Sequence, residues 1–230
     1  MDSSTGAHPR LARLSGEELR GRLALHVLTD RAWSRGRDIL EVAEAAIAGG
    51  ATVIQLRDKT ASTRLLVEEG QALRRLTRER GALLIVNDRI DVALAVDADG
   101  AHVGQDDMPA ALAREMLGPA RILGVSAGNL AEAEAAVAAG ADYLGVGPIY
   151  ATRGKDDAGA PVGPDLLAQI AARWNTPQVA IGGISVENTT DVVRAGAVGI
   201  AVITAVVNAE DVTGAARELV GLVRATLPND

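Results

Sequence analysis

Apolar residues along this chain gather into short runs, and each run is followed by a longer stretch whose apolar positions have helical spacing. The first run, residues 23–29, precedes a helical pattern at 38–48, and this order repeats to the end of the chain. We predict eight strands, over residues 23–29, 52–56, 82–86, 100–104, 121–125, 143–147, 178–181 and 197–203. We predict a helix after each strand, over residues 38–48, 62–80, a short stretch ending at 95, 109–117, 129–139, 164–172, 185–195 and 211–226.

Glycine follows several of the predicted helices directly. It comes after Ala48, Arg80, Ala139 and Ala195, and a glycine in the left-handed conformation is a common helix end. A short amphipathic stretch at 16–22 is predicted to cap one end of the fold. We divide the chain into a frayed or capping N-terminal arm, residues 1–20, and a catalytic domain, residues 21–228.

Strands that alternate with helices imply right-handed βαβ units and a parallel sheet, so the fold class is α/β. Eight units in roughly 200 residues predict a single-domain (β/α)8 TIM barrel. A doubly wound open sheet is the competing architecture, but it usually has fewer strands, and no G-x-G-x-x-G motif follows the first strand here.

Composition narrows the class of protein. Among 230 residues, 23 basic and 30 acidic side chains give a net charge of -7, which argues against general nucleic-acid binding. No apolar run is long enough to span a membrane, and the N-terminus lacks the apolar core of a signal peptide. There is no cysteine for disulfides or thiolate metal sites. We therefore expect a cytoplasmic protein with no nucleic-acid or membrane partner.

Polar residues follow most of the predicted strands, against apolar strand bodies. In a barrel these residues would meet at one rim, where barrel enzymes place their chemistry. The polar segments are Gln55-Leu56-Arg57-Asp58-Lys59, Asn87-Asp88, His102-Val103-Gly104-Gln105-Asp106-Asp107, Ser126, Thr152-Arg153-Gly154-Lys155, Gly182-Gly183 and Ile203-Thr204.

The first of these segments supplies cations. Gln55, Arg57 and Lys59 form a clamp suited to a diphosphate, although the same loop could simply be solvated. Lys155 adds a further cation from the loop that begins where the sixth strand breaks at Pro148. A strand that ends in small residues and continues into donors and cations suits a negatively charged ligand.

Two carboxylates, Asp88 and Asp107, follow neighbouring strands. They could cap the next helices, or they could hold Mg²⁺ together with water and substrate phosphates. Asn87 and Ser126 could satisfy turns or contact polar ligand atoms. His102 is expected to pack or to form hydrogen bonds inside the barrel rather than to act as a base.

The glycine pair Gly182-Gly183 permits a tight turn, and the loops after the last two strands of barrels commonly bind phosphate through backbone N–H groups. One mouth would then hold a cation-rich diphosphate site beside a glycine-rich monophosphate site. This pairing predicts a transferase in which Mg²⁺ and cations neutralise charge on departing pyrophosphate.

Taken in order, these motifs resemble the thiamine phosphate synthase family over about residues 23–207. The resemblance implies a TIM barrel that joins hydroxymethylpyrimidine diphosphate to thiazole phosphate, releasing thiamine monophosphate and pyrophosphate with Mg²⁺ as cofactor. It implies a pyrimidine diphosphate site of Gln55, Leu56, Arg57, Asp58, Lys59, Asn87, Ser126 and Lys155. It implies a thiazole phosphate site of Thr152, Arg153, Gly154, Gly182, Gly183, Ile203 and Thr204. It places Mg²⁺ on Asp88 and Asp107, and it gives the catalytic roles to Arg57, Lys59, Ser126 and Lys155.

The chain departs from the family pattern in places. Where the family loop reads Pro-Thr-x-Thr-Lys, this chain has Gly154 in place of the second threonine, so one hydroxyl is missing. Asp58 stands where glutamate is frequent, and Thr204 stands where serine is commoner. None of these changes removes a residue assigned to the metal or the diphosphate.

Two other functions fit the same barrel, namely a thiazole tautomerase and a non-catalytic sensor of thiamine precursors. Neither needs a diphosphate clamp or a carboxylate pair, and Arg57, Lys59, Asp88, Asp107 and Lys155 are all present. The residues therefore favour the synthase. A homo-oligomer is compatible with the sequence, which does not fix the oligomeric state.

Overall fold

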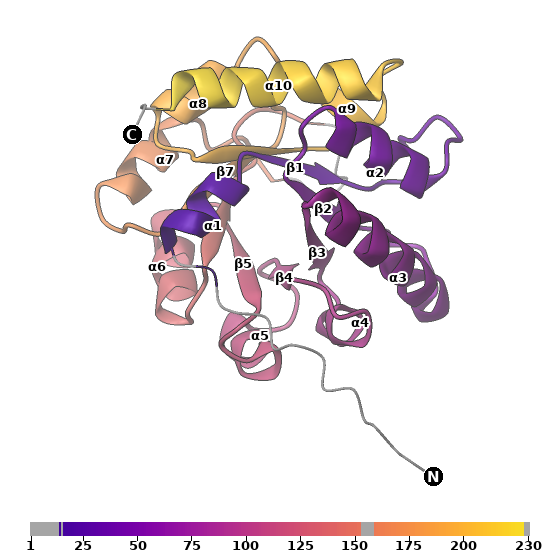
Figure 1. Ribbon diagram of the computed structural model, residues 1–230. Coiled ribbons are helices and arrows are strands. Elements are labelled where there is room, and N and C mark those ends of the chain that lie inside the picture. The colour runs from indigo at the N-terminus through magenta and orange to yellow at the C-terminus, as the bar shows by residue number, and fades with distance from the viewer. Residues whose placement is uncertain (1–13, 15, 153–158, 228–230) are drawn as a thin grey trace.

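The computed structural model describes residue 14 and residues 16–152 and 159–227, and it shows a closed parallel barrel. Each strand pairs with its two neighbours in chain order, and β8 closes the ring against β1 (Figure 1). The strands are β1 (Leu25–Leu28), β2 (Val53–Leu56), β3 (Leu83–Asn87), β4 (Gly100–Val103), β5 (Ile122–Ala127), β6 (Tyr143–Val146), β7 (Gln178–Ile181) and β8 (Gly199–Val202). The predicted (β/α)8 architecture is confirmed.

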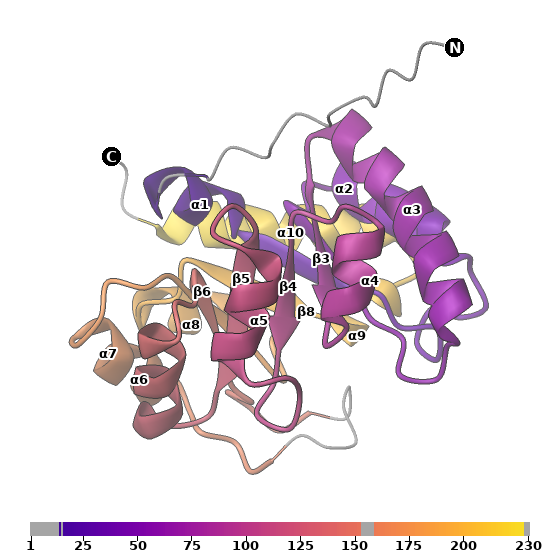
Figure 2. The same ribbon diagram turned by 90° about the horizontal axis from the view of Figure 1, so that it is seen from below.

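Helices lie around the barrel, most of them on its outside (Figures 1 and 2). They are α1 (Gly16–Arg22), α2 (Ile39–Ala48), α3 (Thr63–Arg80), α4 (Ile90–Ala95), α5 (Ala110–Leu117), α6 (Leu130–Ala138), α7 (Asp165–Ala171), α8 (Thr189–Arg194), α9 (Thr204–Val207) and α10 (Val212–Thr226). Side chains at the predicted helix starts act as N-caps, because Asp38, Ser62 and Asp211 each accept a hydrogen bond from a backbone N–H of the first turn. None of the helices in the described parts of the chain is both long and apolar enough to cross a membrane.

Helix α1 lies at the amino ends of the strands. Leu19 is buried, Arg20 donates to the Asn175 side chain (2.7 Å) just before β7, and Arg22 donates to the Gly81 carbonyl (2.9 Å) just before β3. The helix therefore covers the end of the barrel opposite the polar strand ends. The division into an arm at 1–20 and a domain at 21–228 stays a prediction, since residues 1–13, 15 and 228–230 lie outside the described part.

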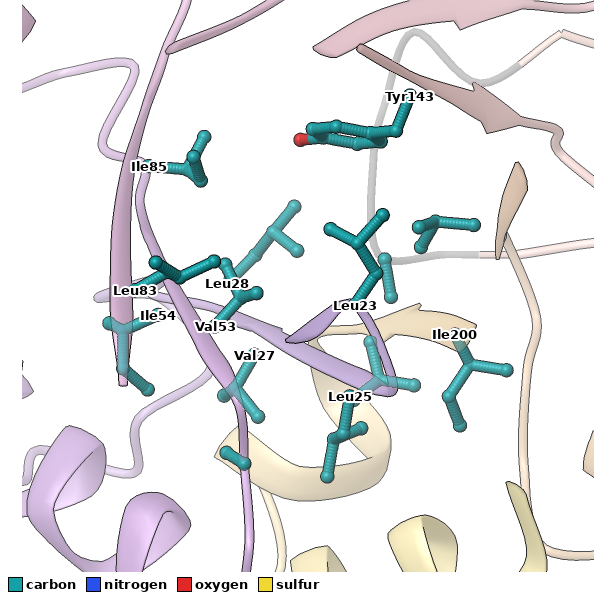
Figure 3. Packing of buried hydrophobic residues seen from close by; sticks show 14 of the residues in the cluster. Leu23, Leu25, Val27, Leu28, Val53, Ile54, Leu83, Ile85, Tyr143 and Ile200 are labelled. Carbon is teal, nitrogen blue, oxygen red and sulfur yellow. The ribbon is translucent and has the colours of Figure 1, made fainter. Parts of the chain in front are cut away.

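The core is aliphatic, as expected for a sheet covered on both faces. Figure 3 shows buried aliphatic side chains on both faces of the sheet: Leu28, Val53 and Ile85 lie on the same face as Tyr143, and Val27, Ile54 and Ile200 lie on the other. Pairing in register places His26 beside Val53 and Ala201, and Gln55 beside Leu28 and Ile85, so these positions share one face of the sheet. His26 and Tyr143 pack edge to face, which identifies this face as the barrel interior.

The glycine prediction holds at three helix ends and is wrong at the fourth. Gly81 (φ 72°), Gly140 (φ 83°) and Gly196 (φ 118°) have positive φ, but Gly49 is right-handed at φ -80° and its neighbour Gly50 (φ 108°) makes the turn. Gly49 serves packing instead. A Cβ there would lie 2.4 Å from the Thr213 carbonyl oxygen, so only glycine lets α10 approach α2 this closely.

Two helices differ from the sequence prediction near the carboxyl rim. The stretch predicted as a helix at 185–195 begins with a turn, in which Ser185 N–H donates to Asn188 Oδ1 (2.9 Å), and α8 starts only at Thr189. The short helix α9 follows β8 directly and was not predicted. The loop after β7 therefore carries a turn at the rim, and the segment after β8 begins a short helix there.

Candidate active site at the carboxyl ends of the strands

A cavity of about 460 Å³ opens at the carboxyl ends of the strands. Its size suits a small organic ligand, and it lies where barrel enzymes carry out their chemistry. Its walls come from loops after seven of the strands. The lining residues are Lys59, Asn87, Asp88, His102, Gly104, Gln105, Asp106, Asp107, Ser126, Gly128, Asn129, Glu132, Gly145, Gly147, Pro148, Thr152, Gly159, Ala160, Val162, Ile181, Gly182, Gly183, Ile184, Ala201, Val202, Ile203 and Thr204.

Most of the predicted site residues meet in this cavity. Those that line it are Lys59, Asn87, Asp88, Asp107, Ser126, Thr152, Gly182, Gly183, Ile203 and Thr204. Those that do not line it are Gln55, Leu56, Arg57 and Asp58. Arg153, Gly154 and Lys155 lie outside the described residues.

Arg57 sits next to the rim but is engaged with the protein. Its guanidinium forms an ion pair with Asp30, and its side chain is 8% exposed. Its backbone N–H donates to Thr29 Oγ1 (2.9 Å), which in turn donates to the Arg57 carbonyl (3.1 Å). The end of β1 thus fixes the first residue of the predicted clamp, and a ligand that used Arg57 would compete with Asp30.

The neighbours of Arg57 along the chain are held by contacts within the protein. Gln55 is buried inside the barrel at 3% exposure. Leu56 points outwards, since a Cβ on Gly70 of α3 would lie 3.3 Å from Leu56 Cδ2, so Leu56 could reach a ligand only through its backbone. Asp58 closes the turn before α3 by accepting from the N–H groups of Thr60 and Ala61 (both 2.9 Å).

The pKa of Asp58 reflects this role. Burial alone would raise it, but the hydrogen bonds from Thr60 and Ala61, together with Arg31, outweigh burial and hold the pKa below its ordinary value. Asp58 therefore stays charged as part of the loop. Its side chain is 8% exposed and bonded within the protein, so it has a structural role in this loop, and its assignment to the ligand stays a prediction.

The two predicted metal ligands are not helix caps. Arg89 and Pro109 occupy the N-cap positions of α4 and α5, so the capping alternative is wrong for both Asp88 and Asp107. Asp88 instead has a left-handed backbone (φ 62°), which is uncommon for a residue with a side chain and concentrates at functional sites. Asp107 Oδ2 accepts from the Gly104 N–H (2.7 Å), which holds the carboxylate at the cavity wall.

The donor set fits Mg²⁺ bound in the open manner that this ion prefers. Asp88 and Asp107 both face the cavity, and the described residues contain no group of three or more histidine, cysteine or acidic side chains that could enclose a metal. Mg²⁺ is usually held by one or two carboxylates while water and substrate phosphates complete its shell. Asp88 and Asp107 would therefore hold Mg²⁺ with water and ligand oxygens completing its shell.

The opposite wall is built from backbone. Gly182 (φ 94°) and Gly183 (φ 66°) are left-handed, and a Cβ on Gly183 would lie 2.6 Å from the Ala151 carbonyl oxygen, so both positions need glycine. Within the described part of the chain, the N–H groups of Gly183, Ile184 and Thr204 find no acceptor. Backbone donors that face a cavity without a protein partner are suited to phosphate oxygens.

His102 and Ser126 join the cavity to the barrel interior. His102 Nε2 lies 2.9 Å from Ser126 Oγ, and His102 Nδ1 lies 3.1 Å from the Tyr143 hydroxyl. The expectation that His102 forms hydrogen bonds inside the barrel is confirmed.

Sequence reasoning missed part of the wall after β5. Gly128, Asn129 and Glu132 line the cavity, and Glu132 accepts from the N–H of Gly128 (2.7 Å) while Asn129 Oδ1 accepts from the Glu132 N–H (3.0 Å). This pattern resembles a capping box, except that Glu132 accepts from the N–H of the residue before the N-cap, and Asn129-x-x-Glu132 indicates such a helix start in the sequence. The signal was present, but it marks a helix start and carries no information about a cavity.

Comparison of the sequence with protein families gives a clear match. The model of the family described as thiamine monophosphate synthase matches residues 25–206. A thiamine-phosphate synthase of Chloroflexus aurantiacus is 62% identical over 202 residues, covering 88% of this chain and 93% of that protein. A thiamine-phosphate synthase of Moorella thermoacetica is 54% identical over 195 residues, covering 85% of this chain and 93% of that protein.

Solved structures agree with the sequence comparison. A thiamine phosphate pyrophosphorylase from Pyrococcus furiosus superimposes with a TM-score of 0.84 at 46% identity, covering 91% of this chain and all (100%) of that one. A 3-hexulose-6-phosphate synthase superimposes with a TM-score of 0.60 at 18% identity, a likeness that concerns the fold alone.

Proposed function

The chain belongs to the thiamine monophosphate synthase family, and from this premise we propose that it is a thiamine-phosphate synthase. It transfers the hydroxymethylpyrimidine group from its diphosphate to thiazole phosphate, and the products are thiamine monophosphate and pyrophosphate. The observation that carries this proposal is the division of one cavity into two unlike walls.

The first wall suits the diphosphate. Lys59, Asn87, Asp88 and Asp107 reach the cavity from the ends of β2, β3 and β4. A lysine supplies positive charge for phosphate oxygens, and the two carboxylates would hold Mg²⁺ against the same oxygens. When bound, Mg²⁺ supplies charge that stabilises the departing pyrophosphate.

The second wall suits the monophosphate. Gly183, Ile184 and Thr204, whose N–H groups have no acceptor among the described residues, line the cavity at the ends of β7 and β8, and Thr204 and Thr152 add hydroxyl groups. A phosphate held there would place the thiazole beside the pyrimidine on the other wall. Holding two reactants side by side removes much of the entropic barrier to their reaction.

The cations of the loop at 151–155 complete the proposal. We assign Lys155 to the leaving pyrophosphate, as the family resemblance implies, and Arg153 and Gly154 to the thiazole phosphate. Arg57 would join the diphosphate site by exchanging its Asp30 partner for phosphate oxygens. No side chain needs to act as a nucleophile in this scheme, because the protein's work is to position both ligands and to stabilise charge.

The test is a reaction with both substrates. The purified chain is incubated with hydroxymethylpyrimidine diphosphate and thiazole phosphate, with Mg²⁺ or with a chelator, and thiamine monophosphate and pyrophosphate are both measured. We expect equal amounts of the two products, and only with Mg²⁺.

The alternatives give different results in the same assay. A tautomerase or a sensor on this barrel releases no pyrophosphate, so its absence would refute the synthase. Undiminished product formation in the chelator would leave the reaction in place and refute the metal assignment. Omission of thiazole phosphate is the control that separates transfer from simple hydrolysis of the diphosphate.

A further inference from the structure

Three side chains from consecutive strands form a hydrogen-bonded chain that runs from the barrel interior to the cavity. The Tyr143 hydroxyl on β6 bonds to His102 Nδ1 on β4 (3.1 Å), and His102 Nε2 bonds to Ser126 Oγ on β5 (2.9 Å). His102 and Ser126 line the cavity, whereas Tyr143 is 1% exposed and projects into the interior (Figure 3). The three groups thus connect a fully buried phenol to a hydroxyl at the site.

The barrel is built to hold this chain. Two interior positions next to it are glycine, and a Cβ on Gly124 would lie 2.4 Å from the Tyr143 hydroxyl and 2.5 Å from His102 Nδ1. A Cβ on Gly145 would lie 2.7 Å from His102 Cε1. Any larger residue at these positions would push the imidazole and the phenol apart. The two glycines therefore leave the space in which the His102 and Tyr143 rings can form their hydrogen bond.

Protons in this chain have one consistent arrangement. A buried phenol proton needs an acceptor, and within the described ranges the Tyr143 hydroxyl contacts no hydrogen-bonding atom except His102 Nδ1. Burial, helped by the nearby Asp142 charge, raises the pKa of Tyr143, so the phenol keeps its proton. Tyr143 therefore donates to Nδ1, and the neutral imidazole carries its proton on Nε2.

The position of the imidazole proton decides what Ser126 can do. Because Nε2–H donates to Ser126 Oγ, the serine accepts from His102 and must point its own proton elsewhere. The backbone at Ser126 is held as well, since the Gln105 side chain donates to the Ser126 carbonyl (2.6 Å). With the opposite tautomer, Ser126 would donate to His102 and would offer the cavity only lone pairs.

We propose that Tyr143 and His102 are positioning residues that fix Ser126 as a hydrogen-bond donor towards an acceptor atom of the pyrimidine diphosphate. The identity of this ligand rests on the proposed function, whereas the direction of the hydrogen bonds does not. A diphosphate presents only acceptors to the protein, so a serine committed to donating suits this substrate.

A second interior histidine shows that packing alone does not create such a chain. His26 also contacts the Tyr143 ring, with centroids 5.4 Å apart, yet its buried Nε2 has no hydrogen-bond partner among the residues that the structure describes. Both histidines fill space beside the same phenol. Only His102 links that phenol to a cavity hydroxyl.

The first test reads the tautomer directly and needs no activity. The chain has three histidines, and nitrogen NMR of the ligand-free protein, with His102 assigned by its loss in His102→Gln, reports which ring nitrogen carries the proton. We expect Nε2–H in the parent and a shift towards Nδ1–H in Tyr143→Phe. The matched control is Tyr150→Phe, which removes the only other phenol and should leave the His102 signals unchanged. Nδ1–H in the parent, or no change in Tyr143→Phe, would overturn the proposal.

The second test asks whether Tyr143 acts through Ser126. We expect Tyr143→Phe to lower kcat/KM for the pyrimidine diphosphate by about tenfold, the effect of one hydrogen bond, and to change nothing further when Ser126 is already alanine. A purely structural role for Tyr143 predicts the same loss in both backgrounds, and that result would refute the positioning role. If the parent makes no thiamine monophosphate, the proposed function fails while the NMR result still decides the direction of the hydrogen bonds.

Discussion

Asp88 adopts a backbone conformation that few residues other than glycine tolerate, and it does so at the cavity wall. Asparagine tolerates the left-handed region about as well as aspartate, so Asp88→Asn removes the charge and leaves the backbone preference in place. If Asp88 holds Mg²⁺, this variant should lose at least about a hundredfold in kcat/KM at low Mg²⁺, since it gives up a charged interaction formed in the transition state. Steady-state rates over a series of Mg²⁺ concentrations measure the effect.

Asp97 supplies the matched control for this experiment. It is also left-handed (φ 54°), but it pairs with Arg78 and Arg121 and does not line the cavity. Asp97→Asn should leave the Mg²⁺ dependence as it is in the parent. Near-parental rates of Asp88→Asn at low Mg²⁺ would remove Asp88 from the metal site.

Single residues mark the limit of what the sequence predicted here. Polar character at the strand ends identified Lys59, Asn87 and Ser126 as rim residues, because strand direction alone places them there. The sequence could not show that Arg57 pairs with Asp30, since 27 residues separate them and the pairing of β1 with β2 brings them together. Leu56 points outwards because it alternates with the inward Gln55 along β2, and its contact with Gly70 of α3 is the part that the sequence could not show.

At the scale of elements, the same carboxylate contact occurs twice at the amino ends of the strands. In each case one aspartate pairs with an arginine and accepts a backbone hydrogen bond. Asp99 precedes β4, binds Arg74 of α3 (2.6 Å) and accepts from the Leu84 N–H of β3 (2.8 Å). Asp142 precedes β6, binds Arg114 of α5 and accepts from the Leu123 N–H of β5 (2.8 Å). Each carboxylate thus connects a helix with the strand that follows it and with the next strand along the chain.

Loss of one such carboxylate contact should lower the stability of the fold and leave the cavity at the carboxyl ends of the strands unchanged. Asp99→Ala leaves Arg74 buried (6% exposed side chain) without its partner, and breaking a buried pair in this way costs about 3–5 kcal/mol of unfolding free energy. Urea unfolding measures this loss, and KM for both substrates should stay at the parental value. Glu44→Ala is the control, because the Glu44–Arg80 pair is about half exposed (53% and 50%) and its loss should cost about 0.5 kcal/mol. Equal losses of unfolding free energy in the two variants would show that Asp99 does not connect α3 with β3 and β4 as inferred.

The alternation of strands and helices could be predicted because it depends on local periodicity, and Asp38, Ser62 and Asp211 announced helix starts through their own side chains. The prediction for Gly49 was wrong because glycine is required there by close packing against Thr213, which lies on a helix far along the chain. Helix α9 was missed because four residues are too few to establish a period.

The whole molecule separates its two tasks by end. At the amino end, α1, the Arg74–Asp99 pair and the Arg114–Asp142 pair close the barrel. At the carboxyl end, left-handed residues and backbone donors without protein partners form the cavity wall. In barrels of this kind, one end of the strands generally serves stability and the other end serves chemistry. Stability supplied by the amino end lets the site keep strained backbone conformations that would otherwise weaken the protein.

The barrel interior also makes stability depend on pH through His26. Burial lowers the pKa of His26 from 6.5 to about 3, so the folded state holds a neutral imidazole while the unfolded chain binds a proton below pH 6.5. The stabilisation is fully present above pH 6.5 and is lost as the pH falls towards about 3, with a slope of about 1.4 kcal/mol per pH unit. The carboxylates with lowered pKa, such as Asp58 and Asp97 with an unfolded value of 3.8, lose their contribution only below about pH 5, so they leave the window from pH 6.5 to about pH 5 to the histidine.

His26→Leu removes the titrating group and the buried Nε2 that lacks a partner. We expect the variant to match or exceed the parent in unfolding free energy at pH 8, since no hydrogen bond of the described residues is lost. At pH 4.5 it should be more stable than the parent by about 2–3 kcal/mol, the linkage slope multiplied by two pH units below 6.5. Urea unfolding of both proteins at several pH values between 8 and 4.5 measures the difference. If the two stability curves run parallel, His26 takes up its proton in the folded barrel, and the dry, neutral interior inferred for it is wrong.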